Sequence, residues 1–157
     1  MLGGAPLNCG GRLIVALKSL HLLVGFAGVL VFLGTGLYMA THFPESYVAD
    51  EAIRYMYRAN HVYLLLGSLI NVAVGIYRTA LRPGWRGRVG RAGSVLMLVA
   101  PFVLAFAFFF EAPRGMPERP ATTLGVLMLL IGVFAQWPNR TGAIGREERR
   151  RAAQREH

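Results

Sequence analysis

Four long apolar runs, separated by charged or Pro/Gly-rich stretches, constrain the fold of this 157-residue chain most strongly. They cover roughly 13–40, 60–81, 95–110 and 121–137. A helix that crosses a bilayer needs about 20 mainly apolar residues, and inside the hydrocarbon its backbone polar groups must be bonded within the protein. We therefore predict an all-α, polytopic membrane protein, a single membrane domain over 1–157. Its four transmembrane helices are expected at about 13–41, 50–81, 90–111 and 120–137.

Basic residues at the ends of these runs predict the orientation of the chain. The formal net charge is +9. The end of the second run and the stretch before the third contain five arginines and no acidic residue, namely Arg78, Arg82, Arg86, Arg88 and Arg91. The segment 138–157 is also basic, whereas the two alternate loops are balanced or slightly acidic. Because Lys and Arg are retained in short cytoplasmic loops, we expect an up-down bundle with both termini cytoplasmic and 138–157 as a basic cytoplasmic tail.

The positive charge does not indicate nucleic-acid binding, which needs a basic face on a soluble module. Here the arginines flank apolar spans, and Trp85 and Trp137 lie at the same inner boundary as interfacial anchors. The expected partners are anionic lipid headgroups at the cytoplasmic face and other membrane helices, with no nucleic acid. Sixteen arginines against one lysine favour a GC-rich bacterial genome. We thus expect a multi-pass protein of a bacterial inner membrane.

Two polar stripes follow one face of the first and second predicted helices. The first comprises Lys18, His21, Gly25, Gly28, Phe32, Thr35, Met39 and His42. The second comprises Arg54, Tyr57, His61, Leu64, Ser68, Asn71, Gly75 and Arg78. In a bilayer such faces must contact protein or water and not lipid. We therefore predict that these helices pair as an antiparallel hairpin, the second one starting before the membrane with Ser46 or Asp50 as its N-cap.

A chain reversal near Val48 sets the register of this hairpin, because facing residue numbers then sum to about 96. The predicted pairs are His42 with Arg54, Met39 with Tyr57, Thr35 with His61, Gly28 with Ser68, Gly25 with Asn71, and His21 with Gly75. Glycine lets two helices approach closely, so that serine or asparagine can bond to the exposed backbone. We expect a helix-packing seam formed by Gly25, Gly28, Thr35, Ser68, Asn71 and Gly75.

His61 is the leading candidate for a cofactor ligand, because ionisable residues within a span are functional candidates. With Met39 or His42 it would hold haem b or copper. The alternative is a structural histidine bonded to Thr35 or to a carbonyl oxygen. We favour that role and expect no resident cofactor. The sequence contains no zinc or Cys-x-x-Cys motif, so no metal site is predicted.

Two further sets of residues lie at the helix ends. The outer polar cluster comprises Glu45, Arg54, Tyr57, Arg58 and Glu111. The inner lipid-headgroup set comprises Lys18, His21, Arg78 and Arg82, with packing beneath the inner loop as the alternative role of His21. Ion pairing is the expected role of the outer polar cluster. A catalytic carboxylate pair would need Glu45 or Glu51 to meet Glu111.

Helix contact is therefore the leading functional class. We expect a small integral inner-membrane protein that is either an accessory subunit of a larger complex or a homo-oligomer. Two alternatives stay open: a haem or metal redox module at His61, and an oligomeric channel or transporter whose mouth is the outer polar cluster. The sequence carries no hydrolase, kinase or phosphate-loop motif, so no catalytic residue is predicted and an enzyme is less favoured.

Overall fold

The computed structural model describes residues 9–46, 50–77, 84–115 and 118–155, with side chains described at 15–43, 50–77, 84–115, 118–137 and 154. These residues form helices and no strand. In chain order the elements are α1 (Cys9–Ser46), α2 (Glu51–Tyr77), α3 (Trp85–Phe110), the short 3-10 helix η1 (Ala112–Arg114) and α4 (Pro120–Arg155). Four segments are long and apolar enough to cross a membrane: Val15–Phe43, Glu51–Tyr77, Trp85–Arg114 and Pro120–Trp137. The all-α class and the four apolar helices are confirmed.

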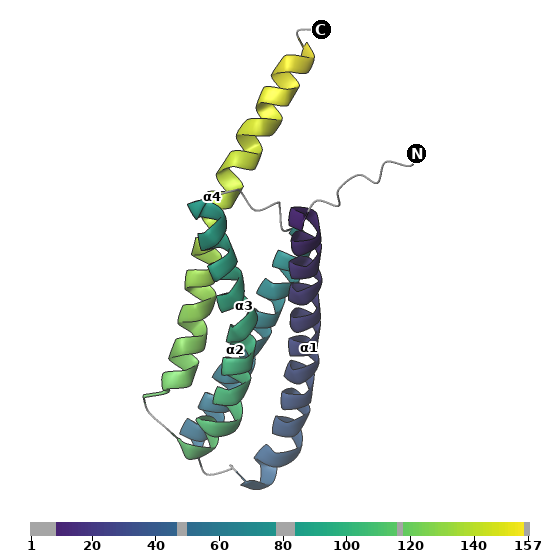
Figure 1. The fold of residues 1–157 in the computed structure, drawn as a ribbon. Coiled ribbons are helices and arrows are strands. Elements are labelled where there is room, and N and C mark those ends of the chain that lie inside the picture. The colour runs from purple at the N-terminus through teal and green to yellow at the C-terminus, as the bar shows by residue number, and fades with distance from the viewer. Residues whose placement is uncertain (1–8, 47–49, 78–83, 116–117, 156–157) are drawn as a thin grey trace.

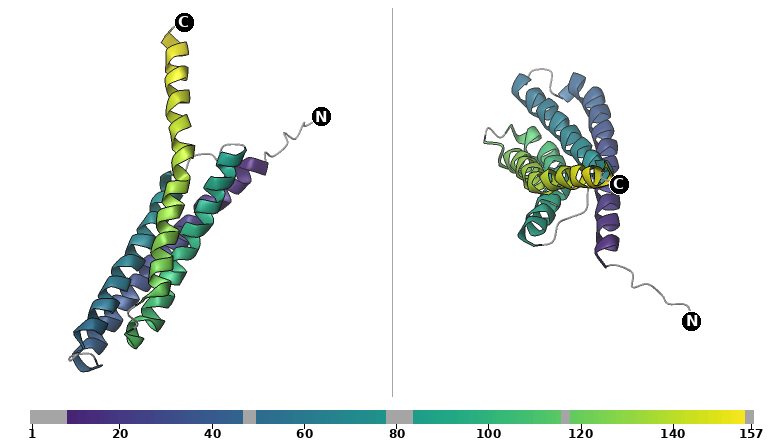
Figure 2. Two further views of the ribbon diagram at one scale, coloured as in Figure 1. Left: turned by 90° about the vertical axis from the view of Figure 1, so that its left-hand side faces the viewer. Right: turned by 90° about the horizontal axis from the view of Figure 1, so that it is seen from above.

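Two helical hairpins make up the structure. α1 packs against α2 and α3 against α4, and the two hairpins meet mainly through α2 and α3. Figure 1 shows the start of α1 and the last turns of α4 at the same end, where α4 extends beyond the other helices. α1 lies at the edge of the group (Figure 2), and none of its described residues approaches α4.

Local signals explain where the helices begin. Asp50 Oδ1 accepts a hydrogen bond from the Ile53 backbone N at 3.0 Å, so Asp50 caps α2 as predicted. α3 begins at Trp85, before the predicted start near residue 90, and Gly84 ahead of it has φ 85°, a conformation that glycine tolerates. α4 continues to Arg155 and therefore runs through most of the predicted tail 138–157.

Apolar side chains form two core clusters at different levels. Leu64, Ala100, Leu104 and Leu129 join α2, α3 and α4. Nearer the turn between α1 and α2, the rings of Tyr57 and Phe108 meet edge to face with centroids 4.9 Å apart. Large apolar side chains also face outward on all four helices, among them Leu30, Leu66, Phe102 and Phe134. Helices that are apolar all round are typical of membrane spans.

The α3–α4 hairpin is fixed by contacts that the sequence analysis did not identify. A Cβ at Gly132 would lie 2.8 Å from the Gly93 carbonyl oxygen, and a Cβ at Gly93 would lie 2.9 Å from that of Gly132. Nearby, Gln136 Nε2 donates to the Gly90 carbonyl oxygen at 2.8 Å and to Ser94 Oγ at 3.0 Å. Close backbone approach and a side-chain amide therefore hold these two helices together.

Candidate functional site

Polar side chains of the apolar helices form three junctions between helices. We name them the inner, middle and outer junctions after the predicted orientation of the chain. The inner junction is centred on Asn71, which is fully buried. Asn71 Oδ1 lies 2.7 Å from His21 Nδ1, and Asn71 Nδ2 donates to the carbonyl oxygens of Gly67 at 2.9 Å and Met97 at 2.7 Å. Since Oδ1 can only accept, His21 donates from Nδ1. One amide thereby joins α1, α2 and α3.

The position of His21 corrects the predicted headgroup role. Its side chain is fully buried and bonded to Asn71, so it cannot contact a lipid headgroup. Leu22, and not His21, lies against Gly75, 2.6 Å from the position of a Cβ there. A buried imidazole needs a hydrogen-bond partner, and the amide supplies one inside the span. Lys18 is half-buried. The other two residues predicted for this set, Arg78 and Arg82, lie outside the described residues.

Glycines let α1 approach α2 along the predicted seam. A Cβ at Gly28 would collide with Ser68 Oγ, so this pair faces as the register of about 96 requires. Gly25 departs from the prediction. A Cβ at Gly25 would lie 2.8 Å from the Val72 backbone N and 3.0 Å from the Ser68 carbonyl oxygen, so Gly25 lies against the backbone of Ser68 and Val72 and not against Asn71. Asn71 is instead turned toward His21 and α3.

The middle junction is the pair Thr35 and His61, which also face each other in the predicted register. Thr35 Oγ1 donates to the Phe32 carbonyl oxygen at 2.9 Å and lies 2.9 Å from His61 Nδ1. A hydroxyl has a single proton, so Thr35 accepts a hydrogen bond from Nδ1–H of His61. The imidazole also stacks on the Phe32 ring with centroids 3.9 Å apart. Both helices thus hold the imidazole in place.

The three residues predicted as cofactor ligands have separate surroundings. His61 is held in the middle junction, and Met39 packs against the aromatic cluster around Tyr57. His42 stacks on Tyr38 with ring centroids 4.3 Å apart, and its Nδ1 lies 3.1 Å from the Tyr38 carbonyl oxygen. A haem iron between helices needs two axial ligands that point at one place. Each of the three side chains instead has its own contacts within the protein, and the described residues include no group of three His, Cys, Asp or Glu that could hold a metal ion.

The residues predicted as the outer polar cluster separate onto different faces. Tyr57 is buried in the core, and Glu111 is buried against the start of α4. Arg54 and Arg58 line an open groove on α2. The side chain of Glu45 lies outside the described residues. A catalytic carboxylate pair with Glu111 is therefore not formed by Glu51, which lines the groove with the arginines.

The outer junction is built on Glu111, where the end of α3 meets α2 and α4. Its carboxylate accepts hydrogen bonds from the backbone N of Ala121, the backbone N of Thr122 at 3.0 Å and Thr122 Oγ1 at 2.7 Å. It therefore caps α4, whose first N–H groups have no partner within the helix. Asn60 Oδ1 accepts a hydrogen bond from Arg119 and lies 2.9 Å from Thr122 Oγ1. The junction connects three helices.

Glu111 was predicted to lie in a polar cluster, but none of the partners found in the outer junction was predicted. Asn60 lies three residues after Tyr57 and four before Leu64, so a stripe drawn through it would have shared their buried face. Pro120 follows Arg119 at the first position of α4, which is a recognised signal for a helix start. Together these features indicate a buried amide and a helix start in need of a cap. They do not indicate that the two meet.

We expect Glu111→Ala to lower the free energy of unfolding by about 2 kcal/mol, because backbone donors at the start of α4 lose their acceptor. Glu111→Gln keeps one side-chain oxygen and should cost about half as much. Unfolding in mixed micelles of a mild detergent and dodecyl sulfate measures both values. The exposed Glu118, replaced by alanine, is the matched control. Equal losses for Glu111→Ala and Glu118→Ala would show that the cap contributes nothing.

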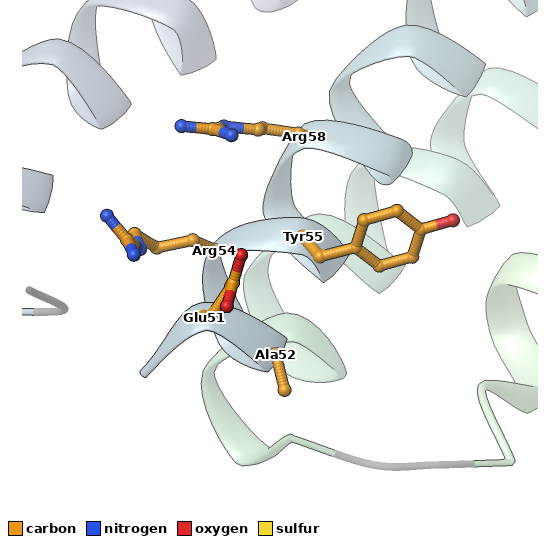
Figure 3. A pocket seen from close by; sticks show the side chains of 5 residues that line it. All are labelled: Glu51, Ala52, Arg54, Tyr55 and Arg58. Carbon is orange, nitrogen blue, oxygen red and sulfur yellow. The ribbon is translucent and has the colours of Figure 1, made fainter. Parts of the chain in front are cut away.

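An open groove of about 600 Å³ lies beside the first two turns of α2. It is lined by Glu51, Ala52, Arg54, Tyr55 and Arg58. Figure 3 shows the guanidinium groups of Arg54 and Arg58 on the same side of the helix and the Tyr55 ring directed away from them. Their spacing of four residues places the two arginines one turn apart on one helix face. We call this feature the arginine groove.

Comparison of the chain with protein-family models, curated proteins and solved structures finds no match.

Two features of the surface remain besides the three junctions. One is the outward face of α1, which has little protein against it. The other is the arginine groove.

Proposed function

We propose that this chain is a multi-pass protein of a bacterial inner membrane that acts through helix contacts, pairing with a second copy of itself along α1. Its four spans run up and down, with both termini in the cytoplasm. Arg86, Arg88 and Arg91 at the start of α3 support this orientation, as does the placement of the start of α1 and the end of α4 together (Figure 1). Anionic headgroups are the proposed neighbours of this basic end.

The packing of α1 is the observation that carries this function. α1 lies along α2, meets α3 at few positions and does not approach α4 within the described residues. Most of the circumference of α1 therefore has no neighbour among the described residues. On that outward side lie Leu30, Gly34 and Leu37. Nothing lies within 4 Å of a Cβ built at Gly34, so another helix has room to approach its backbone.

A second copy is the proposed partner because the outward face of α1 is complementary to the same face of another copy. Leu30, Gly34 and Leu37 are separated by four and then three residues, so two α1 helices related by a two-fold axis would set leucines beside glycine. The polar residues at the centre of each junction are not available to bind a second subunit. Asn71, His61 and Glu111 already have partners within the monomer. This internal bonding favours helix contact over a channel or a redox centre.

Gly34→Leu is expected to weaken dimerisation about tenfold in lipid vesicles, because the added side chain holds the two α1 backbones apart. Subunit counting by single-molecule photobleaching measures the monomer–dimer balance as the ratio of protein to lipid is varied. Thr123→Leu, on the exposed face of α4, is the matched control. A wild-type protein that stays monomeric at every ratio would overturn the proposal, as would a Gly34→Leu variant that dimerises like the wild type.

A further inference from the structure

Arg54 and Arg58 have no polar partner among the described residues. Neither guanidinium makes a hydrogen bond or an ion pair with a described side chain, and Arg54 Nε is buried without an acceptor. An arginine side chain is always charged and offers five N–H donors. A buried donor that lacks an acceptor is unfavourable. The N–H donors of these two residues are therefore free to bind an anionic group from outside the chain.

The arginine groove presents both guanidinium groups to one space. They project from the same side of α2, one turn apart, into a volume of about 600 Å³ (Figure 3). Glu51 is the sole acidic residue among the lining side chains, so the lining has one more positive than negative charge. Such an excess in an open groove attracts anions.

The depth of the groove in the membrane indicates which anionic group is available to bind there. Its residues precede the apolar run of α2, which begins at about residue 60. Tyr55 beside the groove is 68% exposed, and tyrosine is enriched where lipid headgroups meet the hydrocarbon. At that depth the phosphate of a phospholipid is the abundant anionic group. Soluble phosphate esters reach the same place from the aqueous side.

We propose that Arg54 and Arg58 form a binding site for a phosphate group at the outer end of α2. Guanidinium donors match phosphate oxygens in geometry, and bonds between two charged groups are short and strong. The site lies at the opposite end of α2 from Tyr77, where the described part of this helix ends. It does not require the pairing of α1, whose outward face lies elsewhere on the molecule.

Lipid retention by the full-length protein tests this site. Native mass spectrometry after detergent purification and incubation with phosphatidylglycerol gives the lipid bound per chain. The double variant Arg54→Gln with Arg58→Gln is expected to bind about tenfold more weakly. Arg114→Gln is the matched control at the same end, because Arg114 already donates to the Phe110 carbonyl oxygen and lies over the Phe110 ring. Its lipid binding should equal that of the wild type.

Competition with glycerol 1-phosphate distinguishes the two sources of the phosphate. Displacement of the lipid at millimolar concentration would assign the site to soluble esters, and retention of the lipid would assign it to headgroups. The double variant Arg54→Lys with Arg58→Lys keeps the charge but loses the planar fork, so intermediate affinity is expected. Wild-type affinity in the lysine variant, or equal affinity in the glutamine variant and the Arg114→Gln control, would overturn the site.

Discussion

Replacing Asn71 with leucine is expected to lower the free energy of unfolding by about 3 kcal/mol. The substitution removes the bonds to His21, Gly67 and Met97, so the buried Nδ1–H of His21 loses Asn71 as its acceptor. A polar bond between membrane helices contributes about 0.6 kcal/mol on average, so the lost bonds alone do not account for this loss. The larger part comes from the buried Nδ1–H of His21 that loses this acceptor, at about 1–3 kcal/mol.

A double-mutant cycle with His21→Leu measures the part of the loss that comes from His21. The double variant replaces both polar groups and is expected to be more stable than Asn71→Leu alone. His42→Leu is the matched control, because His42 is an exposed histidine on the same helix as His21. Unfolding in mixed micelles provides the four free energies of the cycle. A loss below about 0.5 kcal/mol in Asn71→Leu would mean that the inner junction does not stabilise the fold.

Gly132→Ala is expected to cost about 2 kcal/mol, a large effect for a single methyl group. The added Cβ would lie 2.5 Å from Met97 Cγ and 2.8 Å from the Gly93 carbonyl oxygen. The methionine side chain can move aside, but the carbonyl belongs to the backbone of α3. The two helices must therefore separate locally, which weakens the contacts around the crossing, including the bond from Gln136.

Gly34→Ala is the matched control for this substitution. Nothing lies within 4 Å of its new Cβ, and alanine has a higher helix propensity than glycine by about 1 kcal/mol. We therefore expect opposite signs, with a gain at Gly34 and a loss at Gly132, when both variants unfold under dilute conditions in mixed micelles. A gain at both positions would show that α3 and α4 are not in close contact at Gly132.

Apolar run length and residue spacing predicted the helices and part of the α1–α2 pairing, because both are local properties of the sequence. Thr35 lies by His61 and Gly28 by Ser68, at the levels that a reversal near Val48 implies. The partner of His21 was not predictable in this way. A long side chain reaches one helical turn, about 5.4 Å, so a register cannot choose between Asn71 and Gly75.

The outer junction was beyond sequence reasoning for a different reason. Glu111 meets Thr122 and Asn60 because the chain leaves α3 through η1 and turns at Gly115, which has φ 59°. These contacts depend on the path of a short connection between two helices. No repeated pattern in α2 or α4 encodes that path. The sequence therefore indicated a polar role for Glu111 but did not indicate which residues bind it.

The unequal contacts among the helices suggest the order in which the chain assembles as it is synthesised. α1 and α2 contact each other extensively, and so do α3 and α4, whereas the contact between α2 and α3 is smaller. The first pair can therefore close once its two helices have entered the bilayer, before the second pair exists. The bond from Asn71 to the Met97 carbonyl oxygen then joins the α1–α2 hairpin, which has already formed, to α3 as it enters the membrane.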